Sequence, residues 1–510
     1  MTTESAVEHR DVAIVGAGPA GLGAAVVLRE HGVDVTLIDE QPRAGGQILR
    51  QPPRTFTVER WLPARLYDRV KAALHAMNER TDVDWRMSSS VLGILRPSPY
   101  RAREHRTGHD LWIQGPSGCY FLHANTVLVA AGCYERPLAF PGWTLPGVMG
   151  AGAIQGFVKS QQLVPGSRFL LAGSHPLQLV VADQLLSAGA DVAAVVFTQR
   201  MQRALAALAH PQVLVQNSRQ FLETARILRR LRRARVPVIF GASILRVEGT
   251  SAVERATIAM LGTDGTIDSE RTQVIDCDRV GVCHGFLASS ELPRQAGASV
   301  SWREHAGGWL VDHDEWFESS VGNLFVAGEV TGVAGADAAL EKGRVAAVGM
   351  LRALGRIDAR QAQELARPPR RRLAGIQRFA QVLHELARPP QRLADATMTG
   401  EAILCRCESI RRGEFERELR ENPHVLSSDA AKLLTRVGMG LCQGRMCGDN
   451  AARTLARLRG LTATDVGPFQ AQAPVKPVMI GVLVGLKPDV QGVGLKPDLR
   501  DTPSARERCS

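Results

Sequence analysis

A strand, a glycine turn, a helix and a second strand follow one another between Asp11 and Gly46, and this stretch constrains the fold more than any other. Apolar residues 12–15 predict a short β-strand that ends in the turn Gly16-Ala-Gly18-Pro-Ala-Gly21. Residues 24–31 predict a helix that ends at Gly32, and residues 33–38 predict the next strand. This order is typical of the first unit of a doubly wound sheet that binds a dinucleotide.

Each glycine of the turn has its own task in such a unit. Gly16 permits the tight turn, Gly18 lets the backbone approach a pyrophosphate, and Gly21 lets the helix pack closely on the strand. The helix N-terminus offers unpaired N–H groups and a partial positive charge to the phosphates. Asp39 follows Gly21 after seventeen residues, where an acid accepts the ribose hydroxyls. The sequence therefore predicts a dinucleotide site here.

Two later strand ends favour a flavin as the ligand of this turn. Residues 126–129 predict a strand that ends in small residues at 130–132 and continues into prolines, which suits a chain that passes under a cofactor. Residues 321–327 predict another strand, followed by Gly328-Glu329 and a helix that begins near Ala336. Glu329 can bind a ribityl hydroxyl, and the helix N-terminus can stabilise negative charge on a reduced flavin.

A second unit with the same spacing lies between residues 168 and 197, but its chemistry differs. His175 stands where the second glycine is expected, and a side chain there crowds a pyrophosphate. No acid closes the second strand, which is followed by Thr-Gln-Arg200. A nicotinamide cofactor, an adenine nucleotide (ATP or NAD(P)) bound by Arg200, and a purely structural role all stay open, the last two being favoured.

Four cysteines near the C-terminus form two close pairs. Cys405-Arg-Cys407 and Cys442-Gln-Gly-Arg-Met-Cys447 are separated by 34 residues. A [2Fe–2S] cluster takes four thiolates and tolerates varied spacing, which makes it the favoured interpretation. Structural zinc also accepts four cysteines, but its usual pairs are C-x₂₋₄-C. Disulfides are the third and least favoured interpretation.

Composition limits the compartment and the partners. The chain has 510 residues, a formal net charge of +11 and nine cysteines, which indicates two to four domains without a secreted disulfide framework. The arginine run at 226–235 has apolar residues at helical spacing and no aromatic residues beside it, so it predicts a helix face that is solvated or meets an acidic partner, and no nucleic-acid site. No signal peptide is evident in the polar N-terminus, and the apolar run 478–486 is too short to span a bilayer. We expect a cytoplasmic protein with at most peripheral membrane association.

The remaining chain predicts short strands within 82–129 and 239–280, a helix over 66–77, and a linker with helical and proline-rich portions over 360–398. The hexapeptide ELARPP occurs in it at 364–369 and again at 385–390. The predicted division is a discontinuous flavin domain (1–145 and 285–358), an inserted Rossmann-like domain (146–284), a linker (359–398), a cysteine domain (399–465) and a tail (466–510).

Together these motifs resemble the flavin-containing alpha (A-type) subunits of heteromeric, dye-linked amine and amino-acid dehydrogenases. That group includes the A-type chain of opine oxidase, D-hydroxyproline dehydrogenase and the B-type chain of hydrogen cyanide synthase. The matching motifs cover nearly the whole chain: GAGPAG at 16–21, IDEQPRAGGQI at 38–48, VLVAAGCYERPLAFPGW at 127–143, FVAGEVTG at 325–332, CRCE at 405–408, TRVGMGLCQGRMC at 435–447 and PVKPV at 474–478.

The resemblance implies an α/β fold of the two-dinucleotide-binding-domain flavoprotein class with a small C-terminal [2Fe–2S] domain like bacterioferritin-associated ferredoxin. It implies FAD on Gly16, Gly18, Pro19, Ala20, Gly21, Asp39, Glu40, Gly46, Gln47, Val91, Ala131, Gly132, Gly328 and Glu329. It implies the cluster on Cys405, Cys407, Cys442 and Cys447, although the last two are separated by four residues where that ferredoxin has C-x₂-C. The Cys pair of the class's disulfide reductases is missing after Gly46, so a disulfide reductase is not expected.

In the group that this chain resembles, the substrate is oxidised by a partner subunit, which carries its own FAD and resembles D-amino-acid oxidase. The substrate is an amine, amino acid, imino acid or opine. This chain would receive or relay electrons, and a small third protein is a further candidate partner. No catalytic acid or base stands out in the sequence, which agrees with that role. Two alternatives stay open: a self-contained NAD(P)H-dependent ferredoxin-type reductase, and a zinc-bound C-terminal docking module without a redox role.

Overall fold

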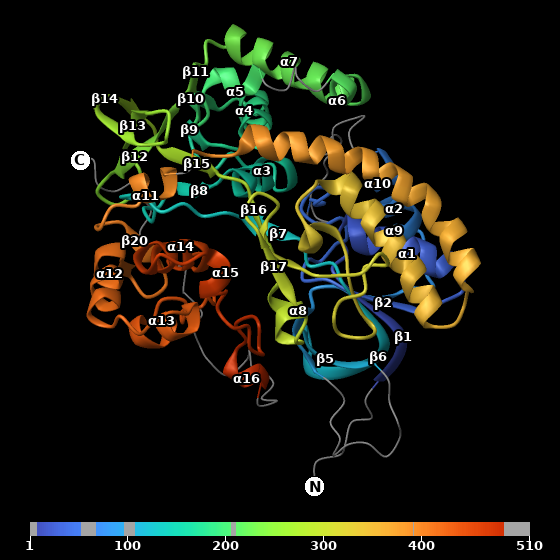
Figure 1. Cartoon of the computed structure of the whole chain (residues 1–510). Helices are drawn as coiled ribbons and strands as arrows, with labels where there is room; N and C mark the ends of the chain where they lie inside the picture. Colours follow the sequence, from blue (N-terminus) through green and yellow to red (C-terminus); the bar gives the residue numbers. More distant parts are fainter. Residues whose placement is uncertain (1–7, 53–67, 96–107, 206–210, 391, 484–510) are drawn as a thin grey trace, which may run out of the picture.

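A mixed sheet near the N-terminus forms the first half of the fold. The structure is a computed structural model that describes residues 8–52, 68–95, 108–205, 211–390 and 392–483 (Figure 1). The strands lie in the order β3-β2-β1-β6-β5-β4, with β19 also paired to β6. Their bounds are β1 (Glu8–Val15), β2 (Val35–Ile38), β3 (Asp84–Arg86), β4 (Ser90–Leu95), β5 (His109–Gly115), β6 (Gly118–Val129) and β19 (Leu324–Val326). β3, β2, β1, β6 and β19 are parallel, whereas β5 is antiparallel to both β4 and β6.

Two helices from distant parts of the sequence pack together on this sheet. α1 (Pro19–Glu30) contacts α9 (Ala336–Ala353), and α2 (Asp68–Asn78) lies beside both. A Cβ atom on Gly23 would lie 2.6 Å from the Leu340 carbonyl oxygen, so only glycine permits this approach of the two helices. The helix predicted over 66–77 is confirmed as α2, although its first two residues lie outside the described ranges.

A second, fully parallel sheet has the order β11-β10-β9-β15-β8. It comprises β8 (Val148–Gly150), β9 (Arg168–Gly173), β10 (Asp191–Phe197), β11 (Val238–Phe240) and β15 (Arg279–Cys283), with α3 (Ala151–Ser160), α4 (Leu177–Ser187), α5 (Met201–Leu205), α6 (Pro211–Gln216) and α7 (Ser218–Arg233). The antiparallel strands β12 (Ala242–Glu248), β13 (Arg255–Leu261) and β14 (Ile267–Asp276) lie beside it. In α7 only Ile227 and Leu231 are buried, as expected of a solvated arginine-rich face.

Short elements connect the two sheets. β7 (Cys133–Glu135) pairs antiparallel with β16 (Phe286–Ala288), so the chain crosses between the sheets there in both directions. α8 (Glu291–Gln295), β17 (Val300–Arg303), β18 (Gly308–Val311) and the 3₁₀ turn Gly328–Thr331 follow before α9. The predicted α/β architecture with two Rossmann-like sheets is therefore observed.

The segment predicted as a linker contains α10 (Ala359–Ala387), which is 29 residues long and lies along α9 (Figure 1). Its prolines Pro368 and Pro369, from the first ELARPP copy, lie inside the helix, whereas the second copy spans the end of the helix at Ala387 and its prolines lie beyond that end. Tertiary packing explains the difference, because Ala362 and Ala366 are buried against Trp316.

The C-terminal region packs against the second sheet rather than standing apart from it. It comprises α11 (Leu393–Thr397), β20 (Ile403–Cys405), β21 (Ile410–Arg411), α12 (Arg412–Glu421), α13 (Ser428–Thr435), α14 (Gly448–Arg459), α15 (Ala463–Val466) and α16 (Ile480–Leu483). Phe415 and Leu455 belong to the same apolar cluster as Leu170 of β9. Among the helices of the described residues, none has the length and apolar character needed to cross a membrane.

A buried carboxylate joins α9 to α10. The side chain of Glu341 is 1% exposed and accepts hydrogen bonds from Arg372 Nε (2.8 Å) and Nη2 (2.9 Å). We expect Glu341→Gln to lower the free energy of unfolding by about 1–3 kcal/mol, because the partly exposed guanidinium groups of Arg344 and Arg372 lose the buried carboxylate to which they are bonded. The matched Glu364→Gln removes only an exposed pair with Arg360 and should leave urea unfolding unchanged. Equal unfolding curves for the two variants would contradict this prediction.

Candidate functional site

The carboxyl ends of four parallel strands meet at one edge of the first sheet. Gly16 N donates to Ile38 O (2.8 Å), Ala130 N to Val15 O (2.8 Å), and Ala327 N to Val129 O (3.1 Å). These hydrogen bonds join the ends of β1, β2, β6 and β19, from which the predicted cofactor residues follow. Ligands of open α/β sheets bind at such an edge.

The three glycines of the first turn meet different surroundings. Gly16 has φ +108°, and a Cβ there would lie 2.4 Å from Ala130 O. A Cβ on Gly21 would lie 1.9 Å from Gly16 O, whereas one on Gly18 would meet only Gly46, at 3.7 Å. Gly16 and Gly21 are therefore required by packing. Gly18 leaves an open cradle at the N-terminus of α1, where Pro19 and Ala20 form the first turn.

Asp39 is tied to the glycine turn. Its carboxylate accepts hydrogen bonds from Ala17 N (2.6 Å) and Gln41 N (2.7 Å), and burial raises its pKa. Glu40 is exposed and pairs with Lys476 from the C-terminal segment. Val91 is buried in β4, two residues after Ser89, whose backbone N–H donates to Asp39 O (2.9 Å), so it lies near the end of β2.

The two later strand ends complete the edge. Ala131 is exposed, and Gly132 has φ +77° with no heavy atom within 4 Å of the place that a Cβ would take. Glu329 follows Gly328 and accepts hydrogen bonds from Ala334 N (3.0 Å) and Gly335 N (2.9 Å). Burial raises the Glu329 pKa. The carboxylate thus holds the loop that enters α9, and each oxygen keeps a further acceptor position.

Two buried lysines support this edge. Lys342 of α9 donates to Gly328 O (3.1 Å) and Gly332 O (2.7 Å), and burial lowers its pKa to about 8. Lys159 of α3 donates to Gln47 O (3.3 Å) and Ile48 O (2.7 Å), and burial lowers its pKa to about 8 as well. Lys159 therefore links the second sheet to the segment after Gly46.

The second turn is occupied by its own side chain. His175 Nδ1 accepts a hydrogen bond from Leu177 N (3.2 Å), and the ring packs edge-on against Phe286 at 5.2 Å. Burial lowers the His175 pKa to about 4, which keeps the ring neutral at pH 7. Gln199, at the end of β10, donates to Ser174 O (2.6 Å) and fills the place where an acid would bind a ribose.

The structure brings the four C-terminal cysteines together as two pairs. Cys405 is hydrogen-bonded to Cys447, and Cys407 to Cys442. Backbone N–H groups of Gly438, Glu408 and Cys407 point at the Cys405 sulfur, and those of Gly444 and Met446 at the Cys442 sulfur. These contacts, with the Cys447 thiol first, lower the Cys405 pKa to about 6. Within the described ranges, no three His, Cys, Asp or Glu side chains surround a point where one metal ion would fit.

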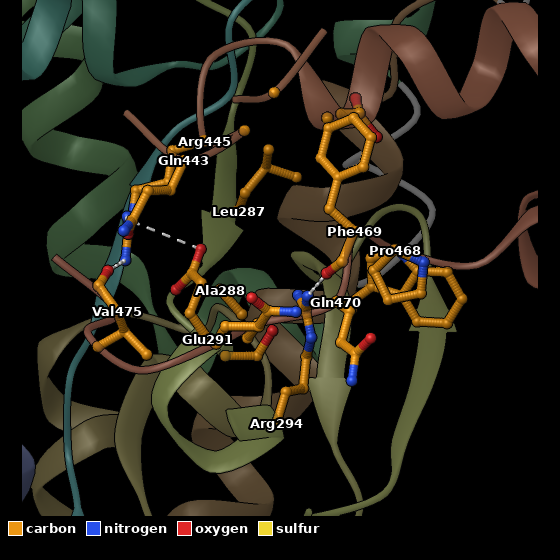
Figure 2. A pocket seen from close by; sticks show the side chains of 18 of the residues that line it. Leu287, Ala288, Glu291, Arg294, Gln443, Arg445, Pro468, Phe469, Gln470 and Val475 are labelled. Atoms are coloured by element: carbon orange, nitrogen blue, oxygen red, sulfur yellow. Dashed lines mark hydrogen bonds and ion pairs between the residues drawn. The ribbon is translucent and has the colours of Figure 1, made fainter. Parts of the chain in front are cut away.

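A cavity of about 470 Å³ lies between the cysteine loop and the elements that connect the sheets (Figure 2). Leu287 and Ala288 of β16 and Glu291 and Arg294 of α8 line one side of it. The other side is lined by Gln443 and Arg445 of the cysteine loop and by residues 468–475. Figure 2 shows Arg445 and Glu291 pointing toward each other across it.

Sequence reasoning missed the charged residues that hold these parts together. Lys342 could have been noticed as a lysine within the apolar stretch of α9, but Glu291 and Asp449 have no local signal. Asp449 pairs with Arg136 at 3.6 Å, and the two residues are 313 positions apart. Such contacts depend on tertiary structure and not on spacing.

A family profile described as "Pyridine nucleotide-disulphide oxidoreductase" matches residues 10–347, which is most of the chain. The chain belongs to this family. Membership supports an FAD-dependent oxidoreductase with an α/β dinucleotide-binding fold, which agrees with the open first turn described above.

Curated relatives cover nearly the whole length of this family member. The HcnB subunit of hydrogen cyanide synthase from Pseudomonas protegens is 31% identical over 472 residues, covering 91% of this chain and 95% of that protein. The A-type chain of opine oxidase from Rhizobium meliloti is 30% identical over 479 residues, covering 93% and 98%. The resemblance predicted from the motifs is thereby confirmed.

Two further matches have lower sequence identity. The alpha chain of sarcosine oxidase from Corynebacterium is 29% identical over 354 residues, but this match covers only 32% of that protein. The crystal structure of L-proline dehydrogenase from P. horikoshii superposes with a TM-score of 0.66 at 20% identity, covering 94% of this chain and 81% of that one. The superposition shows a shared fold that includes the C-terminal region.

The glycine geometry separates cofactor binding from folding. We expect Gly18→Ala to leave the melting temperature of the flavin-free protein unchanged, because the added methyl group has room, and to weaken FAD binding at least about tenfold. Gly21→Ala should destabilise the flavin-free protein by about 1–3 kcal/mol, because its methyl group overlaps Gly16 O. Flavin titration and thermal melting measure the two effects. Full FAD affinity in Gly18→Ala would contradict the prediction.

Proposed function

We propose that the chain is the FAD- and [2Fe–2S]-containing electron-transfer subunit of a heteromeric dehydrogenase or oxidase that acts on an amine, amino acid, imino acid or opine. The observation that carries this proposal is the presence in one chain of an open dinucleotide edge and two paired sets of thiols. The relatives named as subunits of hydrogen cyanide synthase and opine oxidase support a redox subunit of a larger assembly.

The residues of the first edge fit FAD. The open cradle at Gly18 suits a pyrophosphate at the start of α1, and Asp39 is close enough to the turn to accept ribose hydroxyls. Val91 would contact the adenine end, and Gly46, Gln47, Ala131, Gly132, Gly328 and Glu329 the ribityl chain and the ring. FAD supplies reversible two-electron redox chemistry, while these residues bind and orient it.

The thiol arrangement fits a two-iron cluster better than one zinc ion. A [2Fe–2S] cluster needs two protein ligands on each iron, and the sulfurs of Cys405, Cys407, Cys442 and Cys447 form two pairs. Structural zinc usually takes C-x₂₋₄-C pairs, which Cys405-Arg-Cys407 does not match. The backbone N–H groups that point at Cys405 and Cys442 would stabilise thiolate charge and bound sulfide.

The division of labour follows the motifs. We assign FAD to residues 1–145 and 285–358, a second nucleotide-like domain to 146–284, and the cluster to 399–465. The substrate would be oxidised at the flavin of a partner subunit resembling D-amino-acid oxidase, because the first edge offers no evident substrate acid or base. His175 leaves the second domain without room for a pyrophosphate, so an adenine nucleotide there would have to bind outside the turn. The cysteine usage supports a cytoplasmic location.

Metal analysis tests the cluster. We expect the wild-type chain, purified anaerobically, to contain two iron atoms and two acid-labile sulfides per chain, and Cys447→Ser to lose both. Cys119→Ser, which changes a cysteine outside the set, should retain them. If the purified chain contains zinc but no iron or sulfide, the electron-transfer role is refuted and the zinc-bound docking module is the favoured function.

Anaerobic reduction tests the role in the complex. We expect an opine, hydroxyproline, sarcosine or glycine to bleach the flavin absorbance of the complete complex. NADPH or NADH should not reduce the isolated chain, because the ring of His175 occupies the second turn. Rapid reduction of the isolated chain by NADPH would favour the self-contained reductase instead. His175→Gly reopens the turn and is the matched variant in which nicotinamide binding is gained.

A further inference from the structure

One ten-residue segment contacts residues beside Cys405 and beside Cys447. The segment Tyr134–Trp143 begins two residues after Gly132, which lies at the edge of the first sheet where FAD is proposed to bind. Trp143 Nε1 donates to Ile403 O (2.6 Å), two residues before Cys405. Arg136 pairs with Asp449 at 3.6 Å, two residues after Cys447, and their side chains are 11% and 5% exposed. A hydrogen bond and an ion pair therefore attach the segment that follows Gly132 to the residues beside Cys405 and Cys447.

Tyr134 begins a second connection to the same loop. Its hydroxyl donates to Glu291 Oε1 (3.3 Å), and the same carboxylate oxygen lies 3.6 Å from Arg445 Nε. Arg445 lies within the Cys442–Cys447 loop and is the single charged residue between those two cysteines. Both side chains of the ion pair are largely buried, at 15% and 20% exposed, and they line the cavity in Figure 2.

Arg445 also holds the backbone of its own loop. Its guanidinium donates to Cys442 O (3.3 Å) and to Val475 O (3.0 Å). The neighbouring Gln443 Nε2 donates to Pro474 O (2.9 Å). Since Val475 N in turn donates to Leu92 O of β4, the loop is attached to the first sheet from this side too (2.8 Å).

We propose that Arg445 is a positioning residue which, held by Glu291 and Tyr134, fixes the Cys442–Cys447 loop against the flavin-binding half and sets the reduction potential of the cluster through its charge. The proposal rests on the [2Fe–2S] assignment only in its second part. The first part concerns the loop itself and holds for the chain without iron.

The sign of the electrostatic effect follows from the charges around the loop. A positive charge beside a cluster favours the reduced, more negative state and raises its potential, whereas a carboxylate lowers it. Arg445 and Glu291 largely offset each other across 3.6 Å. Arg294 and Lys432 also line the cavity, while Asp449 is balanced by Arg136 and Arg453. Removing one member of the Glu291–Arg445 pair therefore exposes the charge of the other.

Redox titration of the cluster-loaded full chain tests the charge effect. We expect Arg445→Gln to lower the potential and Glu291→Gln to raise it, each changing the ratio of oxidised to reduced cluster about tenfold, which is about 59 mV for a one-electron couple. The double variant should return close to wild type. Glu315→Gln, an equal charge change at an exposed pair with Arg370, should not move the potential. Shifts of the same sign in both variants, or none, would overturn this part.

Hydrogen exchange of the full chain, with iron and sulfide removed by a chelator, tests the positioning effect. Peptides that cover residues 438–448 should exchange about tenfold faster in Arg445→Gln and in Glu291→Gln than in wild type or Glu315→Gln. Unchanged exchange in both variants would overturn the positioning role. A wild-type chain that binds no iron or sulfide refutes the proposed cluster, and the exchange result still decides the role of Arg445.

Discussion

The hydrogen bonds across the carboxyl ends of β1, β2, β6 and β19 are the constraint on which the rest of the structure depends. They hold Gly16 beside the end of β2, and they hold Ala130 and Ala327 beside strands that are more than a hundred residues away in sequence. Gly21 and Gly23 can then bring α1 against the turn and against α9, because neither carries a Cβ. The cradle at Gly18 and the loop held by Glu329 follow from this arrangement. Backbone hydrogen bonds between the strand ends are thus sufficient to form the edge at which a dinucleotide can bind, without a contribution from the ligand.

The parts added to this edge are attached by buried or partly buried charges. Glu341 joins α10 to α9, Lys159 joins the second sheet to the segment after Gly46, and Asp449 joins the cysteine region to Arg136. Removing one partner of a buried pair is more costly than breaking a surface pair, so these contacts define the relative placement of the parts. The apolar cluster that contains Leu170 and Phe415 stabilises the contact between these parts, but apolar burial is non-directional and does not fix their relative orientation.

The periodicity of apolar residues predicted helices and strands correctly where the whole strand–turn–helix unit lies within about thirty residues of sequence. The strand–turn–helix units at 11–46 and 168–197 are found as predicted, and the strand ends that carry the predicted cofactor residues lie at one edge of the first sheet. The continuous α10 was not predicted, because Pro368-Pro369 usually ends a helix and only the tertiary contacts of Ala362 and Ala366 offset that cost. The Tyr134–Glu291–Arg445 connection could not be predicted either, since its members come from three separate segments.

The two glycine turns show how one backbone pattern can give an open and a closed site. Both follow a strand, enter a helix and lie at the carboxyl ends of parallel strands. At Gly18 the missing side chain leaves space, whereas at His175 an imidazole folds back on Leu177 N and packs on Phe286. Phe286 belongs to β16, which pairs with β7 beside the flavin edge. The residue that closes the second turn therefore contacts the same connecting strands that lead to the cysteine loop. This arrangement agrees with the proposed electron-transfer function, in which the second turn has a structural role and binds no nicotinamide.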